Sequence, residues 1–123
     1  YPGLAYADNG DIAVGGGMHG GLHQHELNNL LTAGGDLFRQ AHVVETPTGL
    51  VDIVPTMLAA LEGEAPERMT GRVLAEAFRI ETRPPFWQEM LLRAERGDYA
   101  QEIRVAQIEG APNHYLRGGR RTA

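Results

Sequence analysis

Four side chains of the kinds that bind metal ions lie close together early in the sequence: His19, His23, His25 and Glu26. Neutral imidazole nitrogens and carboxylate oxygens are common zinc ligands. His19 and His23 are four residues apart, a spacing that places two side chains on one face of a helix. A local zinc site built from these four residues is therefore one hypothesis. The pair Gly20-Gly21 weakens it, because glycine interrupts the helix that would align the first two histidines.

His19 has a second possible role, because it lies among glycines on both sides, Gly15–Gly17 and Gly20-Gly21. Glycine reaches backbone conformations with positive φ and lets the main chain approach a ligand closely. A histidine in such a loop is well presented to a metal ion or a phosphate. His42 and His114 have no partner residues at a useful spacing, and we interpret both as ordinary polar side chains without a special role.

Composition limits the classes of function. The 123 residues are enough for one domain with a single core. A formal net charge of -5 argues against a nucleic-acid-binding or membrane-surface protein, because both need a concentrated basic face. The sequence has no cysteine, so a transition metal would have to be bound by His, Asp or Glu. No apolar run approaches the roughly 20 residues needed to span a bilayer.

Several elements must position these side chains. Residues 2–7 form a short apolar run typical of a buried strand, and residues 12–14 could complete a hairpin with it. Leucines at helical spacing predict a helix over residues 23–33, directly after the His19 loop, with Gly34-Gly35 as its stop. Residues 37–38 and 43–44 indicate a pair of extended segments.

The strongest helical pattern covers residues 50–61, where apolar side chains recur on one face. Asp52 lies in its N-cap region and Pro55 in its first turn, where the missing amide hydrogen costs nothing. Gly63 is expected to end the helix.

The last part of the sequence changes from helical to strand patterns. A short helix is predicted over residues 72–78. Residues 87–94 and 99–109 flank the turn Arg96-Gly97-Asp98 and predict a β-hairpin, and Tyr115-Leu116 could add a third short strand. Strand and helix alternation followed by an antiparallel meander predicts a layered α/β or α+β domain.

Two sequence blocks resemble the C-terminal part of the alkaline phosphatase superfamily, and within it the type I phosphodiesterase/nucleotide pyrophosphatase branch. The first block is residues 17–22 with residues 26–29. The second is residues 51–58 with Pro66, Met69 and residues 71–74. The second block is shared with sulfatases and identifies the superfamily, whereas the histidine followed by glycine in the first block is similar to the last zinc ligand of the phosphodiesterase branch. Residues 34–38 resemble a Gly-Pro-x-Phe turn of the family, with glycine in place of proline.

The resemblance implies an α/β fold. Residues 1–79 would be the C-terminal segment of an alkaline-phosphatase-like α/β/α sandwich, and residues 80–123 a C-terminal antiparallel β-hairpin or meander. Members of this family bind two divalent metal ions, usually zinc, and cleave phosphodiester or pyrophosphate bonds with a Thr or Ser nucleophile. His19 would be a ligand of one zinc ion. The other ligands and the nucleophile lie upstream in such enzymes, and the sequence contains no Asp-His dipeptide. No catalytic residue is therefore expected within these 123 residues.

Other positions of the two blocks have structural interpretations. Asp52 resembles a buried aspartate at a helix start, where amide hydrogen bonds and the helix dipole stabilise its charge. Arg72 could pair with Asp52 or cap a neighbouring helix, and Thr56 lies inside a helix, where it is a poor nucleophile. Glu26 and Asn29 could support the His19 loop and orient the imidazole.

Three functional hypotheses remain open at this stage. The first is part of a phosphodiesterase acting on a small phosphodiester or nucleotide, inactive as an isolated chain. The second is part of another two-metal member of the superfamily: a phosphatase, phosphonate hydrolase or phosphomutase. The third is a non-enzymatic metal-binding or interaction module rich in histidine. Because the chain starts at Tyr1 without a methionine, we expect a piece of a larger protein. The helices at residues 22–31 and 51–61 would then lose the upstream strands that they cover, so we expect the fragment to self-associate or to need its missing N-terminal part.

Overall fold

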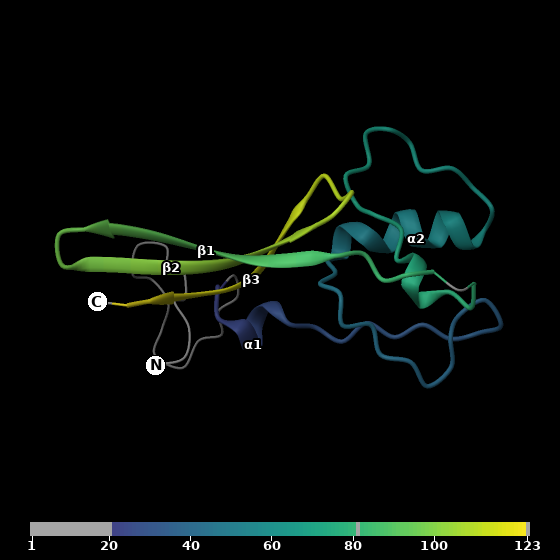
Figure 1. Cartoon of the computed structure of the whole chain (residues 1–123), viewed down its shortest axis with the longest axis horizontal. Coiled ribbons are helices and arrows are strands. Elements are labelled where there is room, and N and C mark those ends of the chain that lie inside the picture. Colours follow the sequence, from purple (N-terminus) through teal and green to yellow (C-terminus); the bar gives the residue numbers. More distant parts are fainter. Residues whose placement is uncertain (1–20, 81, 123) are drawn as a thin grey trace, which may run out of the picture. The chain divides into compact units, whose positions relative to one another are not determined.

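The computed structural model describes residues 21–80 and 82–122 (Figure 1). The strands predicted at residues 2–7 and 12–14 and the His19 loop lie outside the described residues. The described part combines a three-stranded antiparallel sheet with a few helices, so the predicted mixture of helix and strand is confirmed at this coarse level.

The sheet has the strand order β1-β2-β3, with β1 at Trp87–Arg96, β2 at Tyr99–Ile108 and β3 at His114–Arg121. The predicted hairpin is confirmed. Its turn is the pair Gly97-Asp98, in which Gly97 has φ +58°, a conformation that glycine adopts without steric cost. The third strand is also present but is longer than the two residues that the sequence pattern indicated.

The hydrophobic core of the described residues is small. Ala106 and Ile108 lie two apart on β2, so their side chains point to the same face of the sheet. They form a buried cluster with Tyr115 of β3, and Trp87 and Ala111 pack against this cluster.

The helix predicted over residues 50–61 is confirmed. A turn of 3-10 helix, η1 at Leu50–Asp52, leads into α2 at Ile53–Ala60, and Pro55 lies in the first turn as expected. The helix ends before the predicted glycine: Glu62, not Gly63, takes the left-handed conformation with φ +57°, and the Gly63 amide donates to the Leu58 carbonyl at 2.8 Å.

Three other predicted elements are shorter in the structure than the sequence pattern indicated, so their predicted lengths were wrong. The helix predicted over residues 23–33 is only α1, Gln24–Leu27, because Asn28 is extended and Leu30 is 91% exposed, so no buried face supports a longer helix. The helix predicted over residues 72–78 is the single 3-10 turn η2, Ala75–Ala77. The extended pair near residues 37–44 is reduced to one isolated bridge between Phe38 and Phe78.

The chain divides into two compact units, which we name by their main elements. The α2 unit comprises Leu31–Glu89 and Ala106–Tyr115. The hairpin unit comprises Met90–Val105 together with the described residues before 31 and after 115. Among the described helices, none combines the length and the apolar character required to cross a membrane.

Candidate functional site

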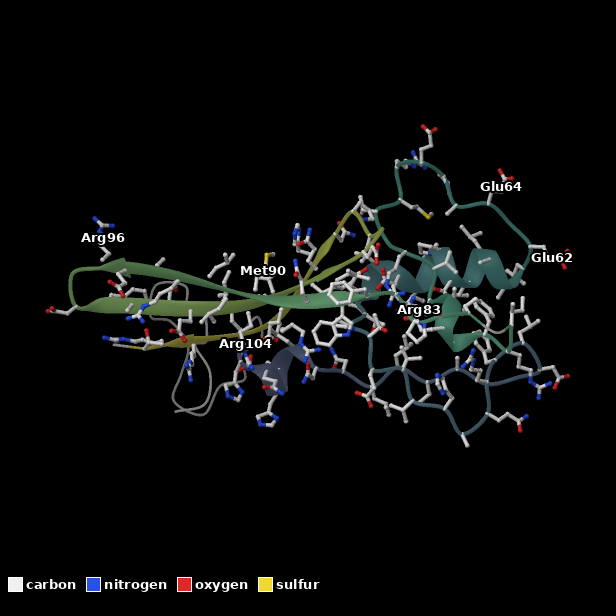
Figure 2. All side chains as sticks on the ribbon, in the orientation of Figure 1. Glu62, Glu64, Arg83, Met90, Arg96 and Arg104 are labelled. Atoms are coloured by element: carbon white, nitrogen blue, oxygen red, sulfur yellow. The ribbon has the colours of Figure 1, made fainter. Side chains whose placement is uncertain are left out.

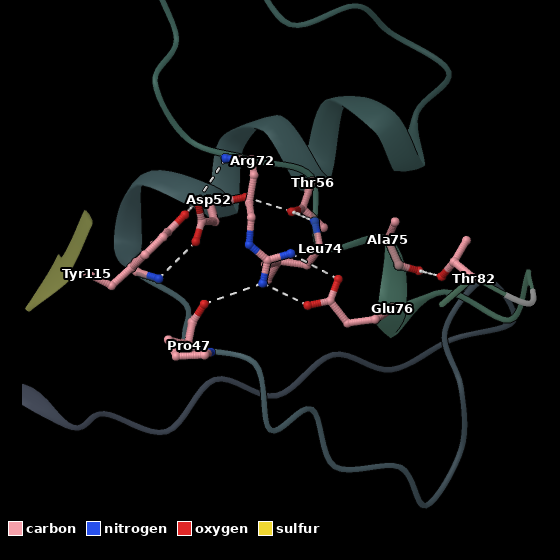
Figure 3. A network of polar contacts seen from close by, with 10 residues as sticks. Pro47, Asp52, Thr56, Arg72, Leu74, Ala75, Glu76, Thr82 and Tyr115 are labelled. Carbon is pink, nitrogen blue, oxygen red and sulfur yellow. Dashed lines mark hydrogen bonds and ion pairs between the residues drawn. The ribbon is translucent and has the colours of Figure 1, made fainter. Parts of the chain in front are cut away.

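Asp52 is the centre of a buried polar network in the α2 unit (Figure 3). It lies where η1 passes into α2, and its side chain is completely buried. Its Oδ2 accepts a hydrogen bond from the Gly49 amide at 2.9 Å, and its Oδ1 accepts one from the Arg72 amide at 2.9 Å. The predicted buried aspartate at the helix start is therefore present, and two backbone amides bind its carboxylate.

Tyr115 provides a third hydrogen bond to the same carboxylate. Its hydroxyl donates to Asp52 Oδ1 at 2.9 Å from β3. Burial, and after it the hydrogen bond to the charged Asp52 carboxylate, together raise the pKa of Tyr115 to about 12. The sequence offered no signal for this contact, because the two residues are 63 positions apart.

Thr56 connects α2 to the segment that follows Gly71. Its Oγ1 donates to the Asp52 carbonyl at 2.6 Å, one helical turn back, and accepts from the Leu74 amide at 3.0 Å. The hydroxyl is buried and is used as both donor and acceptor. Thr56 therefore has a structural role here.

Arg72 binds Glu76 with its side chain rather than Asp52. Its Nη2 and Nη1 lie 2.7 Å and 3.0 Å from the two oxygens of Glu76, a bidentate ion pair, and Nη2 also donates to the Pro47 carbonyl at 3.4 Å. Of the two alternatives for Arg72, side-chain pairing with Asp52 is therefore wrong, because only its backbone amide reaches that carboxylate. The spacing of four residues between Arg72 and Glu76 is the signal that sequence reasoning missed.

The ion pair shifts both groups towards their charged forms. Burial opposes the ionised form of Glu76, but the hydrogen bonds and charge of Arg72 outweigh burial and hold the pKa of Glu76 below its usual value. Burial likewise opposes the charge of Arg72, yet Glu76 raises the pKa of Arg72 above its ordinary value. Both groups therefore stay ionised throughout the physiological pH range.

Gly71 brings the two segments of the network into contact. A Cβ atom at this position would overlap the backbone carbonyl of Val51, so the chain passes too close for any side chain. This close approach places the Arg72 amide within hydrogen-bonding distance of Asp52.

Two histidines of the local zinc hypothesis, His23 and His25, lie close together at the start of α1. The rings of His23 and His25 are 5.0 Å apart between centroids, and His23 Nδ1 accepts a hydrogen bond from the His25 amide at 3.3 Å. Within residues 21–80 and 82–122, no group of three or more His, Asp or Glu side chains could hold a metal ion. His19, the predicted metal ligand, lies outside the described residues, as does any contact that Glu26 or Asn29 makes with it.

The chemistry of the described network is that of a scaffold. The carboxylates of Asp52 and Glu76 and the hydroxyls of Thr56 and Tyr115 are all buried and hydrogen-bonded. A buried, fully bonded carboxylate cannot reach a substrate or a metal ion without losing these bonds.

The chain matches no protein-family model, no curated protein and no solved structure.

Proposed function

We propose that this chain is part of a two-metal hydrolase of the type I phosphodiesterase/nucleotide pyrophosphatase class, with the α/β/α sandwich of the alkaline phosphatase superfamily. Its substrates would be small phosphodiesters or nucleotides. The proposal rests on the resemblance of the two sequence blocks. The observation that carries it is that the polar residues of the second block bind one another.

Those contacts give Asp52, Thr56 and Gly71 of the second block a physical reason. Asp52 accepts the Arg72 amide, Thr56 accepts the Leu74 amide, and Gly71 permits the approach of the two segments. An unrelated sequence that matched the block by chance would have no need to join Val51–Leu58 to residues 71–74. The mutual bonding supports the interpretation that residues 51–58 and 71–74 form one structural unit of such an enzyme.

Within the proposed hydrolase the residues have separate roles. The Asp52 network holds the start of α2 against the loop at Gly71. His19 would coordinate one metal ion through an imidazole nitrogen. The metal ions would stabilise the attacking and leaving oxygens at phosphorus. The nucleophile and the remaining ligands are assigned to residues upstream of Tyr1, since one imidazole cannot hold a metal ion alone.

The test is hydrolysis of bis-p-nitrophenyl phosphate by the complete product of the gene, supplied with zinc. We expect turnover, and we expect His19→Ala to lower kcat/KM by about 100-fold or more and to reduce the bound zinc, because a lost ligand affects both. His42→Ala and His114→Ala are matched controls, since both side chains are exposed, and each should retain activity and zinc.

Two results would contradict the proposal. One is a complete gene product without hydrolytic activity in the presence of zinc, or one whose activity and zinc content are unchanged by His19→Ala. The other is His19-dependent turnover by the 123-residue chain alone, which would show that the site needs no residues from outside this sequence.

A further inference from the structure

A pocket of about 310 Å³ lies within the hairpin unit. Its volume is at the lower end of the range of roughly 300–1,000 Å³ found for small-molecule sites. Polar groups from α1, β2 and β3 line it, together with the backbone of two consecutive glycines. The lining includes His23, Gln24, Glu102, Arg104, Gly118 and Arg120.

The strand geometry explains why these side chains converge. Glu102 and Arg104 are two apart on β2, and Gly118 and Arg120 are two apart on β3, so each pair faces one side of the sheet. Gly118 has no side chain to fill the space between the arginines. A Cβ there would lie 3.6 Å from the guanidinium of Arg104.

The charges in the pocket are unequal. Glu102 is buried, and its Oε2 accepts from Arg120 Nε at 3.0 Å and Nη2 at 2.9 Å, while Arg93 lies 3.8 Å from its other oxygen. This carboxylate is therefore neutralised by arginine. Among the residues that the structure describes, no carboxylate pairs with Arg104, and its Nη2 donates to Gln24 Oε1 at 3.1 Å. The lining is net positive on a chain whose formal charge is -5.

The remaining polar groups can donate further hydrogen bonds. His23 Nδ1 accepts from the His25 amide, so its neutral ring carries the hydrogen on Nε2. Gln24 uses its oxygen towards Arg104, which leaves its NH₂ group as a donor. Arginine, imidazole and amide donors on several sides suit a ligand with more than two acceptor oxygens and more than one negative charge.

We propose that this pocket binds the phosphate group of a small molecule, with Arg104 as the principal contact and the Nη1 group of Arg120, which Glu102 does not bind, as an additional donor. Guanidinium groups bind phosphate with paired, charge-assisted hydrogen bonds. The site uses neither His19, the metal ligand of the proposed hydrolase, nor any residue of the Asp52 network. It therefore holds or fails independently of the proposed hydrolase function.

The experiment is a titration of the chain with inorganic phosphate, followed by NMR at the Gly118 and Gly119 amides and at the arginine Nε–H groups. We expect saturable shifts at these positions. Arg104→Gln should weaken binding by about tenfold or more, because it removes one charge-assisted contact. Arg104→Lys should weaken it less, since the charge remains but the paired geometry is lost.

Arg96→Gln is the matched control. Arg96 is an exposed arginine at the turn end of the hairpin, away from Arg104 (Figure 2), and its loss should leave the phosphate affinity unchanged. An absence of saturable shifts at Gly118 and Gly119 would overturn the proposal. So would an equal loss of affinity in Arg96→Gln, or equally tight binding of acetate, since both would indicate attraction to overall charge and not a phosphate site. Arg104 is exposed and bonded only to Gln24 among the contacts described, so its substitution should leave the fold intact.

Discussion

At the scale of single residues, Asp52 combines complete burial with three hydrogen bonds from Gly49, Arg72 and Tyr115. All three partners are donors. A carboxylate satisfies them because both of its oxygens accept, whereas an amide of the same shape has only one accepting atom. The site therefore requires aspartate specifically, and a polar residue of equal size should not replace it.

Asp52→Asn should lower the free energy of unfolding by roughly 2–4 kcal/mol, because the new NH₂ group faces a donor and leaves a buried N–H or O–H without a partner. Urea denaturation measures the change. Asp98→Asn, at the exposed hairpin turn, is the control and should stay within about 0.5 kcal/mol of the parent. A small effect at Asp52 equal to that at Asp98 would show that the network contributes little to stability.

The raised pKa of Tyr115 predicts that the free energy of unfolding falls at alkaline pH. The unfolded phenol has its ordinary pKa of about 10, and the folded pKa is raised to about 12. The folded state therefore keeps its proton more strongly, and this contribution is complete below pH 10 and lost as the pH rises towards 12. We expect the free energy of unfolding to fall over this window by roughly 2 kcal/mol, since each pKa unit is worth about 1.4 kcal/mol.

The control for this pH dependence is Tyr115→Phe, which should flatten the fall while lowering stability at neutral pH through the lost hydrogen bond. The sequence has no lysine, and its three other tyrosines are common to parent and variant, so the comparison isolates Tyr115. Denaturant unfolding of parent and variant at pH values from 9 to 12 makes the comparison, and parallel curves would contradict the assignment.

At the scale of elements, local signals predicted the structure where they were strong. The α2 helix has a long apolar repeat with Pro55 in its first turn, and the hairpin has Gly97-Asp98 as its turn, so each is encoded within its own residues. The helix predicted over residues 23–33 had the repeat but no surface to pack against, and it is limited to α1.

The candidate site was predictable only in part, for a related reason. Asp52 could be found because helix starts favour such residues. Its partners could not, because Arg72 and Tyr115 are 20 and 63 residues away and reach it only through the tertiary fold. Sequence reasoning found the acceptor and missed the tyrosine donor.

A substitution at Gly71 tests how closely the segment at Gly71 must approach the backbone of Val51. Gly71→Ala should lower stability by roughly 1–3 kcal/mol or more, because its Cβ would overlap the Val51 carbonyl and the backbone must shift. Gly34→Ala is the control, since a Cβ there meets nothing within 4 Å, and it should change the melting temperature little. Equal effects of the two substitutions in thermal unfolding would show that the contact at Gly71 is relaxed in solution.

At the scale of the whole molecule, the described residues expose more large apolar side chains than their small core buries. On α2 and the turn that leads into it, Leu50, Val54, Met57 and Leu61 follow helical spacing and are between 49% and 78% exposed. Scattered apolar residues are normal on a surface, but a continuous stripe usually contacts another surface. The sequence-based expectation that the chain self-associates or needs a further part remains a prediction, and this stripe is where we place the contact.

The isolated chain should therefore associate in a concentration-dependent manner, and the double variant Met57→Glu/Leu61→Glu should shift it towards the monomer mass of 13.4 kDa. Both positions are exposed, so charged side chains there remain hydrated in the monomer and should not unfold it. Ala59→Glu adds one negative charge, half that of the double variant, at an exposed position off the stripe and should leave association unchanged. Light scattering over a concentration series measures the mass. A parent chain that stays monomeric at every concentration would show that the stripe on α2 needs no partner. If Ala59→Glu abolished association as fully as the double variant does, association would depend on net charge and not on the stripe.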